Sequence, residues 1–320
     1  MTLPENLEEF LLKDTDPSIR YFTLRDLLDR DGNDPALRVA QEAIGREGWA
    51  AKILERQREE GYWESFHGRG EDLYLPKYLA TNWTLLILAD LGMTRKDPRI
   101  ERAGELLLET WSKKDGWLGS PGSEVCDTGN SVKMMFRFGF GSDPRIAPAL
   151  EWLVTAQKKD GGWHCFPSEA GTLDGWEAMA AFAAIPPEER SPPVRRAIER
   201  GAEFYLSRGL LTESNGTSYA PWHRLHYPLH YYYDLLVGLE MLSELGYGKD
   251  PRMAPALDEL GSQRNSDGTW NIAISHPDLE TNDPYHPGTP VYPVLLEHAG
   301  LPSRIITLRA LRVLRRCGRL

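Results

Sequence analysis

The stretch AQKKDGGW (residues 156–163) decides the fold, because its order of residue types recurs along the chain. A helix-like run ends in Gln or a charged residue, and a short turn with Gly and then Trp follows. The same phrase reads ERQREEGYW (55–63), WSKKDGW (111–117) and SQRNSDGTW (262–270). Self-similarity at a period of roughly 50 residues is typical of stacked supersecondary units, so the sequence predicts a repeat protein.

A second recurring phrase starts the units with Asp followed by Pro. The Asp side chain accepts hydrogen bonds from free N–H groups at a helix start, and Pro at the first helical position loses no bond. A Gly closes the preceding helix, because Gly readily takes the positive φ of a helix end. The starts are Asp97-Pro98-Arg99, Asp143-Pro144-Arg145 and Asp250-Pro251-Arg252, with Ser191-Pro192 as a variant, and the stops are Gly92, Gly139, Gly246 and Gly300.

Each unit offers a polar amphipathic helix, the Gly-Trp turn, an irregular stretch and then a more apolar helix. The fourth unit, from Ser191, lacks a clear Gly-Trp turn and has a longer polar linker at residues 211–224. The unit is therefore an αα-hairpin whose apolar helix is buried. The apolar helices are expected at residues 77–91, 128–138, 172–185, 228–245 and about 288–299.

The two ends of the chain each supply part of a sixth hairpin. These parts are Asp16-Pro17 with Thr23-Leu24-Arg25, and Pro302-Ser303-Arg304 with Thr307-Leu308-Arg309. A count near six, with partial units at both ends, favours an all-α fold closed into an (α/α)6 toroid, one domain over residues 1–320. An open solenoid of the same hairpins is the alternative.

Composition limits the partners. The 320 residues suit one compact domain, and a net charge of −10 argues against a nucleic-acid surface. No stretch approaches the roughly 20 apolar residues that a membrane span needs, and the start of the sequence lacks the pattern of a secretory signal. Three cysteines give no disulfide framework. We expect a cytoplasmic protein, and the sequence does not fix its oligomeric state.

The Gln…Gly-x-Trp phrase resembles the repeat of squalene–hopene cyclases, oxidosqualene cyclases and protein prenyltransferase β subunits. The chain is similar to a stand-alone, single-toroid member of that prenyltransferase and squalene-cyclase repeat superfamily, and the resemblance runs through nearly the whole chain. It implies a prenyltransferase-like or terpenoid-modifying enzyme with a small apolar ligand, an isoprenoid being the expected class. The repeat is scaffold, so the reaction has to be argued from the site.

Class II terpene cyclases of this superfamily protonate an alkene with the middle carboxyl of Asp-x-Asp-Asp-Thr-Ala. The corresponding stretch here is Glu124-Val125-Cys126-Asp127-Thr128-Gly129, which has a cysteine in that place. A thiol with a reference pKa of about 8.5 is too weak an acid to protonate an isolated double bond. The sequence therefore argues against proton-initiated cyclization.

A zinc site fits the same residues better, because zinc takes thiolate and imidazole ligands and keeps one position open in catalytic sites. Cys126 and Cys165 stand ahead of successive apolar helices, and His226 or His230 stands in the next unit. We favour Cys126, Cys165 and His226 as ligands. His226 lies in a loop beside Pro228 and can turn inward, whereas His230 falls in the first turn of the expected helix. Protein prenyltransferases are similar in binding zinc at the cavity rim. The alternative is a pair of unliganded thiols.

Further candidates occupy the same rim of the expected cavity. The acid–base candidates are Asp127, Asp174 and His230, and Asp127 or Asp174 could also orient a zinc-bound imidazole. The equivalent residues of the fifth unit are His276, Asp283 and His286. Aromatic rings would line the cavity and stabilise an allylic cation, and the expected ones are Trp83, Trp176 and Tyr231.

Two other classes of function stay open. The (α/α)6 shape also serves carbohydrate hydrolases and lyases, which place two carboxylates across a cleft. The candidates for such a pair are Asp127, Asp174, Glu177 and Asp234. A non-catalytic isoprenoid-binding scaffold would use the cavity without arranging thiols or carboxylates around it. The Gln…Gly-x-Trp repeat favours the terpenoid-type enzyme over both.

Overall fold

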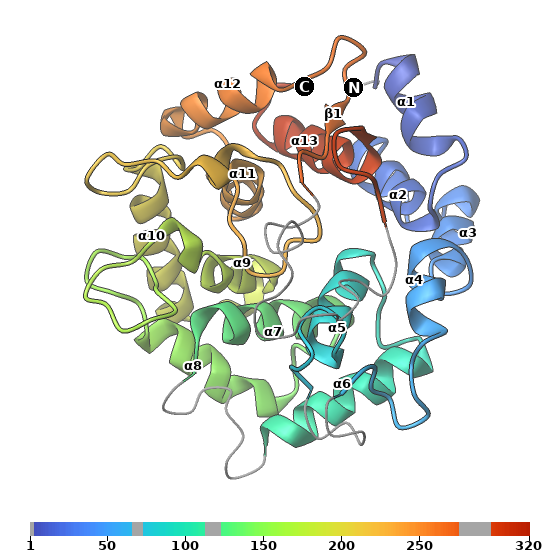
Figure 1. The fold of residues 1–320 in the computed structure, drawn as a ribbon, viewed down its shortest axis with the longest axis horizontal. Helices are drawn as coiled ribbons and strands as arrows, with labels where there is room; N and C mark the ends of the chain where they lie inside the picture. The colour runs from blue at the N-terminus through green and yellow to red at the C-terminus, as the bar shows by residue number, and fades with distance from the viewer. Residues whose placement is uncertain (1–2, 66–72, 113–122, 275–295) are drawn as a thin grey trace. The chain divides into compact units, whose positions relative to one another are not determined.

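The structure is a computed structural model that describes residues 3–65, 73–112, 123–274 and 296–320 (Figure 1). It is rich in helix, as the all-α prediction requires, and in the described part no helix is long and apolar enough to cross a membrane. The α-helices are α1 (Glu5–Leu12), α2 (Pro17–Phe22), α3 (Pro35–Ala43), α4 (Gly48–Leu54), α5 (Thr81–Asp90), α6 (Pro98–Trp111), α7 (Val125–Phe138), α8 (Ala147–Thr155), α9 (Glu177–Ala184), α10 (Pro192–Leu206), α11 (Leu235–Glu244), α12 (Ala254–Ser262) and α13 (Arg304–Arg316).

Within the described ranges, strand structure is confined to short pieces. The strands β1 (Trp270–Asn271) and β2 (Pro302–Ser303) pair antiparallel, with Trp270 opposite Ser303. Several predictions fall outside these ranges. They are the Trp117 turn, most of the helix expected at 288–299, and His276, Asp283 and His286.

The chain forms two compact units, each assembled from separate parts of the sequence. The first unit comprises Met1–Met93, Arg224–Pro228 and Leu257–Leu320, and the second comprises Thr94–His223 and Leu229–Ala256. That residues 1–320 close into one toroidal domain stays a prediction.

In the first unit the two ends of the chain pack against each other. Helix α13 contacts α1 and α2, and Figure 1 shows these red and blue segments side by side. The Arg304 guanidinium donates to the Phe10 carbonyl at 3.0 Å, and Arg312 lies 3.0 Å from the Asp26 carboxylate. The terminal segments therefore meet, as expected for a hairpin assembled from both ends.

In the second unit, amphipathic helices alternate with buried ones. Helix α6 buries positions spaced three and four apart (Ile100, Ala103, Gly104, Leu107, Leu108 and Trp111), which is one face of a helix. By contrast, α9 buries every residue from Glu177 to Phe182. The expected pairing of a polar helix with a buried one is thus present.

The three predicted Asp-Pro starts and three of the four predicted Gly stops are confirmed, whereas the variant start Ser191 precedes α10 without a side-chain cap. Asp97, Asp143 and Asp250 each accept the backbone N–H two residues further on at 2.9 Å. The Arg of each Asp-Pro-Arg phrase also turns back to the same Asp, at 2.6, 2.6 and 2.9 Å. Positive φ occurs at the three stops Gly92 (87°), Gly139 (94°) and Gly246 (97°). The fourth, Gly300, also has a positive φ of 83°, but residues 296–299 before it are not helical, so the described end of the helix predicted at 288–299 is wrong.

The Gly-Trp turns share one set of hydrogen bonds. Each Trp indole N–H donates to the carbonyl ten residues earlier: Trp63 to Ile53 at 2.8 Å, Trp163 to Leu153 at 2.7 Å and Trp270 to Leu260 at 2.7 Å. The glutamines act as local clamps, because Gln57 and Gln157 donate to the carbonyls of Gly61 and Gly161. The phrase therefore encodes a rigid link between the end of one helix and the next irregular stretch.

The fourth unit contains the same turn without its Trp. Glu213 N–H donates to the Thr217 carbonyl at 2.7 Å and Gly216 N–H to the Glu213 carbonyl at 2.9 Å. The equivalent bonds around Gly161 are 2.8 and 3.0 Å long. Ser218 stands where the other turns have Trp, so the sequence pattern missed a turn that the backbone retains.

Three apolar helices begin later than predicted: those expected from residues 77, 172 and 228 begin at Thr81, Glu177 and Leu235. The last of these differs most. The apolar helix expected from residue 228 begins at Leu235, because Asp234 accepts the Val237 N–H at 2.8 Å and caps the helix there. His230 therefore lies in the segment before the helix, with a φ of 44°, and not in its first turn.

Substituting glycines in two equivalent turns separates backbone strain from steric overlap. A Cβ on Gly216 (φ 79°) would have no described atom within 4 Å, whereas a Cβ on Gly161 (φ 94°) would lie 2.4 Å from the Arg200 carbonyl oxygen. We expect Gly216→Ala to cost about 1–2 kcal/mol of unfolding free energy, the strain of a left-handed residue. Gly161→Ala should cost a further ~1–3 kcal/mol from overpacking. Urea unfolding measures both, and equal losses would contradict the steric overlap at Gly161.

Candidate functional site

Helices α7 and α9 of the second unit touch at a glycine. A Cβ on Gly129 would lie 2.5 Å from the Glu177 carbonyl carbon and 2.7 Å from its Cβ, so only Gly permits this approach. Cys126, Asn130 and Lys133 are spaced along α7 at the intervals of one helix face that also carries Gly129. The contact therefore brings a polar face of α7 against the first residue of α9.

Glu177 is the most strongly perturbed carboxyl of this contact. Its side chain is 0% exposed, and neither carboxyl oxygen has a hydrogen-bond partner among the described residues. Burial raises the pKa of Glu177 well above its usual value, and the nearby Cys165 and Asp174 raise it further, while the Lys133 ammonium opposes them. Burial therefore favours the neutral, protonated form of the Glu177 carboxyl.

The segment before α11 is bound to both helices. Asn130 donates its side-chain amide to the His230 carbonyl at 2.6 Å, and the Trp176 indole N–H lies 3.4 Å from the Tyr231 carbonyl oxygen. The Lys133 ammonium, on a side chain that is almost fully buried, lies 5.1 Å from the centre of the Trp176 ring. A cation over an aromatic face is favourable, especially away from water.

Cys126 and Cys165 lie together at the start of α7. The backbone N–H of Cys126 points at the Cys165 sulfur, at an N–Sγ distance of 3.3 Å. The interaction with Cys165, together with burial, raises the pKa of Cys126, and the interaction with Cys126 lowers the pKa of Cys165. Both residues are half-buried. The predicted proximity of the two cysteines is therefore present in the structure.

Asp174 offers a carboxyl that solvent reaches. It lies in a short 3-10 turn (Leu173–Gly175), and its Oδ1 accepts the Trp222 indole N–H at 2.9 Å. Although the residue is exposed, partial loss of water around its carboxyl raises the pKa of Asp174. The hydrogen bond from Trp222 lowers this pKa, and the charge of Glu213 raises it.

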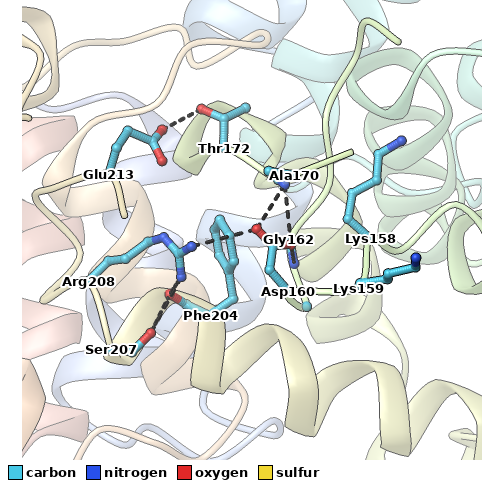
Figure 2. A network of polar contacts seen from close by, with 12 residues as sticks. Lys158, Lys159, Asp160, Gly162, Ala170, Thr172, Phe204, Ser207, Arg208 and Glu213 are labelled. Atoms are coloured by element: carbon cyan, nitrogen blue, oxygen red, sulfur yellow. Dashed lines mark hydrogen bonds and ion pairs between the residues drawn. The ribbon is translucent and has the colours of Figure 1, made fainter. Parts of the chain in front are cut away.

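Glu213, in the turn that replaces the missing Gly-Trp phrase, is fixed beside Asp174. Its Oε1 accepts the Thr172 hydroxyl at 2.7 Å and the Leu173 N–H at 3.3 Å (Figure 2). The Thr172 hydroxyl in turn lies 3.4 Å from the Asp174 backbone nitrogen, which donates to it. One threonine hydroxyl thus connects the Glu213 carboxylate with the backbone of Asp174, a residue of another repeat.

An ion pair holds the segments that carry these groups. Arg208 lies 3.6 Å from the Asp160 carboxylate, and its guanidinium stacks 3.7 Å from the centre of the Phe204 ring (Figure 2). Asp160 also accepts the N–H groups of Gly162 and Gly171. The turn before Trp163 and the approach to Thr172 are therefore fixed to the end of α10.

The second unit brings together most of the residues that the sequence singled out. Cys126, Cys165, Asp174, Trp176, His230 and Tyr231 lie around the α7–α9 contact, and the charge of Asp127, in the first turn of α7, acts on Cys126.

Two further candidates belong to the first unit. The Trp83 indole there donates to the Tyr74 carbonyl at 2.6 Å, and buried His226 pairs through its main chain with Ile274.

The zinc hypothesis gains no support from the geometry. In the described ranges, no three His, Cys, Asp or Glu side chains are grouped as a metal site. The reason for preferring His226 also fails, since His230 is not in a helix. The cysteines supply two adjacent sulfurs, and the part of the chain that the structure describes adds no third ligand to them, so zinc at Cys126, Cys165 and His226 stays a prediction.

Sequence reasoning missed Lys133 and Glu213 and gave Glu177 only a minor place. A Lys inside the apolar run of α7 and a Glu at the start of the apolar run of α9 were visible signals, because buried charges are rare unless they are paired or functional. Glu213 gave no comparable signal, since its partner Thr172 is 41 residues away.

The sequence matches no protein-family model and no curated protein. Solved structures match in fold. A glycosyl hydrolase of family 88 from Bacteroides vulgatus is 14% identical, with a TM-score of 0.54 over 98% of this chain and 97% of that one. A polysaccharide lyase is 12% identical, with a TM-score of 0.52 over 98% and 96%. The type II terpene cyclase MstE from Scytonema is 14% identical over 84% and 96%, with a TM-score of only 0.32.

The neutral Glu177 should make stability depend on pH. A carboxyl whose pKa is raised by folding stabilises the native state below the unfolded pKa of about 4.3 and loses that contribution as the pH rises. We expect the unfolding free energy of the wild type to fall, relative to Glu177→Gln, by up to about 1.4 kcal/mol per pH unit above that value. Urea unfolding across pH tests this.

Glu151, exposed on α8, provides the matched control. Glu151→Gln should keep the pH dependence of the wild type. If Glu177→Gln keeps it as well, Glu177 ionises normally and the argument for a neutral acid is wrong.

Proposed function

We propose that this protein is an acid–base enzyme that acts on a carbohydrate, with Asp174 as the group that meets the substrate. The observation that carries the proposal is a solvent-accessible carboxyl with a raised pKa, oriented by the Trp222 indole N–H at 2.9 Å. A raised pKa keeps a carboxyl protonated closer to neutral pH, as a general acid for a glycosidic oxygen requires.

Glu213 supplies the second carboxyl that carbohydrate hydrolysis generally needs. The bonds from Thr172 and Leu173 fix its direction, and its charge raises the pKa of Asp174. One group would donate the proton and the other would accept one from water or from a sugar carbon. Glu177 is fully buried, and its role would differ from those of Asp174 and Glu213. In its neutral form it adds no full negative charge beside Asp174.

The surroundings of Asp174 suit a sugar ring. Tyr219 is 59% exposed, and its ring centre lies 6.0 Å from that of Trp222, which binds Asp174. An exposed aromatic face beside a carboxyl can cover the apolar face of a sugar. The fold shared with a glycosyl hydrolase and a polysaccharide lyase supports the same class of substrate.

An isoprenoid-type ligand is the second candidate. It is favoured by the turns at Trp63, Trp163 and Trp270, whose common hydrogen bonds give the resemblance to the prenyltransferase and squalene-cyclase repeat a structural basis. Trp83, Trp176 and Tyr231 would then be ligand-lining residues, with His230 and Asp127 as polar neighbours. Zinc held by Cys126, Cys165 and His226 belongs to this candidate.

Either function would use the closed (α/α)6 toroid over residues 1–320 as its scaffold. The alternation of buried and amphipathic helices in the second unit and the meeting of both chain ends in the first support this arrangement. We expect small-angle scattering of the purified protein to give a compact particle. The profile of an elongated superhelix would favour the open solenoid.

Cleavage of oligosaccharides tests the proposal. We expect the protein to cleave a member of a panel of neutral and uronate-containing oligosaccharides, detected as new reducing ends or as the absorbance of an unsaturated lyase product. Asp174→Asn should lower the rate by about 10²–10⁴-fold, the usual contribution of a general acid or base. Glu213→Gln should also lower it while keeping an amide oxygen for Thr172 and Leu173.

Glu169→Gln, at an exposed position of the same segment, should keep full activity. If no oligosaccharide is cleaved or raises the melting temperature, while a prenyl diphosphate does raise it, the carbohydrate proposal is wrong and the second candidate stands. Cleavage that survives Asp174→Asn would remove Asp174 from the mechanism.

A further inference from the structure

The carbohydrate proposal makes no use of the cysteine pair Cys126 and Cys165. The Cys165 sulfur accepts the backbone N–H of Cys126 at 3.3 Å, and this N–H is one of those left without a helical partner at the start of α7. Donors at a helix N-terminus stabilise a thiolate, which is the nucleophilic form of cysteine. Cys165 is half-buried, so a small molecule can reach it.

The segment that carries Cys165 is held in place. The Phe166 N–H donates to His164 Nδ1 at 3.0 Å, and the preceding Trp163 is fixed through its indole bond to Leu153. On the other side, the Cys126 thiol lies 3.6 Å from a carboxylate oxygen of exposed Glu124. The pair thus joins a sulfur that accepts an N–H at a helix start, the thiol of the residue that donates this N–H, and an acceptor for that thiol's proton.

We propose that Cys126 and Cys165 form a redox-active dithiol that reacts with hydroperoxides and closes to a disulfide. The Cys165 thiolate attacks one peroxide oxygen and the O–O bond breaks, leaving a sulfenic acid on Cys165 and an alkoxide that takes up a proton to become an alcohol. The Cys126 sulfur then attacks the Cys165 sulfur and releases hydroxide. The Cys126 proton, passed to Glu124, converts that hydroxide to water.

The overall change balances. Two thiols and one hydroperoxide give a disulfide, an alcohol and water; the sulfurs lose two electrons and the peroxide gains them. The new bond would join the first turn of α7 to the segment after Trp163. Cys317, the third cysteine, is in the first unit, and burial raises its pKa, so it is expected to react more slowly.

The native protein itself provides the test. Reduced protein is treated with an equivalent of hydrogen peroxide, its remaining thiols are alkylated, and it is digested without reductant. We expect one crosslinked peptide pair containing Cys126 and Cys165, lost on adding dithiothreitol, with Cys317 alkylated. Recovery of Cys126 and Cys165 as free thiols, or a crosslink to Cys317, would overturn the proposal.

Variants separate the roles of the two sulfurs. Cys126→Ser should leave a sulfenic acid on Cys165 that a β-diketone reagent traps, whereas Cys165→Ser should slow peroxide consumption at least tenfold. Cys317→Ser is the control and should form the same crosslink as the wild type. If Cys165→Ser consumes peroxide as fast as the wild type, Cys165 is not the attacking group. Since no substrate is needed, the result does not depend on the proposed function.

Discussion

The contact between α7 and α9 at Gly129 is the constraint on which the rest of the second unit depends. With no side chain at Gly129, the helix backbone lies against Glu177, and water is excluded from the Glu177 carboxyl. That exclusion keeps the acid neutral. The same approach sets Lys133 against Trp176 and Asn130 against the His230 carbonyl, so the polar groups of three repeats share one region.

The recurring tryptophans belong to the scaffold. Trp63, Trp163 and Trp270 are each bonded to a carbonyl ten residues earlier and are fully or almost fully buried. These three tryptophans hold helix ends in place, and the candidate functional residues are those that follow the turns. Trp222 differs, because its indole N–H meets the Asp174 carboxylate rather than a carbonyl. The hydrogen bond of Trp222 therefore orients the side chain of Asp174, whereas those of the other three tryptophans hold backbone.

The sequence predicts the local features well, because their causes are local. The hydrogen bond that the Arg145 N–H donates to Asp143, and the positive φ at Gly139, each involve a few neighbouring residues. The start of α11 was misplaced because Pro228 and Asp234 are both plausible helix starts. Residues distant in sequence bind the segment just before Asp234. The Tyr231 carbonyl lies near the Trp176 indole N–H, 55 residues earlier, and the His230 carbonyl accepts the Asn130 amide, 100 residues earlier.

For the candidate site, repeat equivalence was the useful signal. It correctly placed Cys126 near Cys165, although they are 39 residues apart, because both precede an apolar helix. Repeat equivalence did not identify Glu213, because its turn lacks the Trp that defines the repeated phrase. It also offered no way to see that Glu177 would be buried, since that depends on Gly129 fitting against it.

Infrared difference spectroscopy tests most directly the claim that the α7–α9 contact holds a neutral carboxylic acid. Spectra of the wild type minus Glu177→Gln, recorded at neutral pH, should show the carbonyl stretch of one protonated carboxyl in an apolar environment. The band should persist after exchange into D₂O with only a small shift. A difference spectrum with carboxylate bands alone would mean that Glu177 is ionised, and would contradict the account.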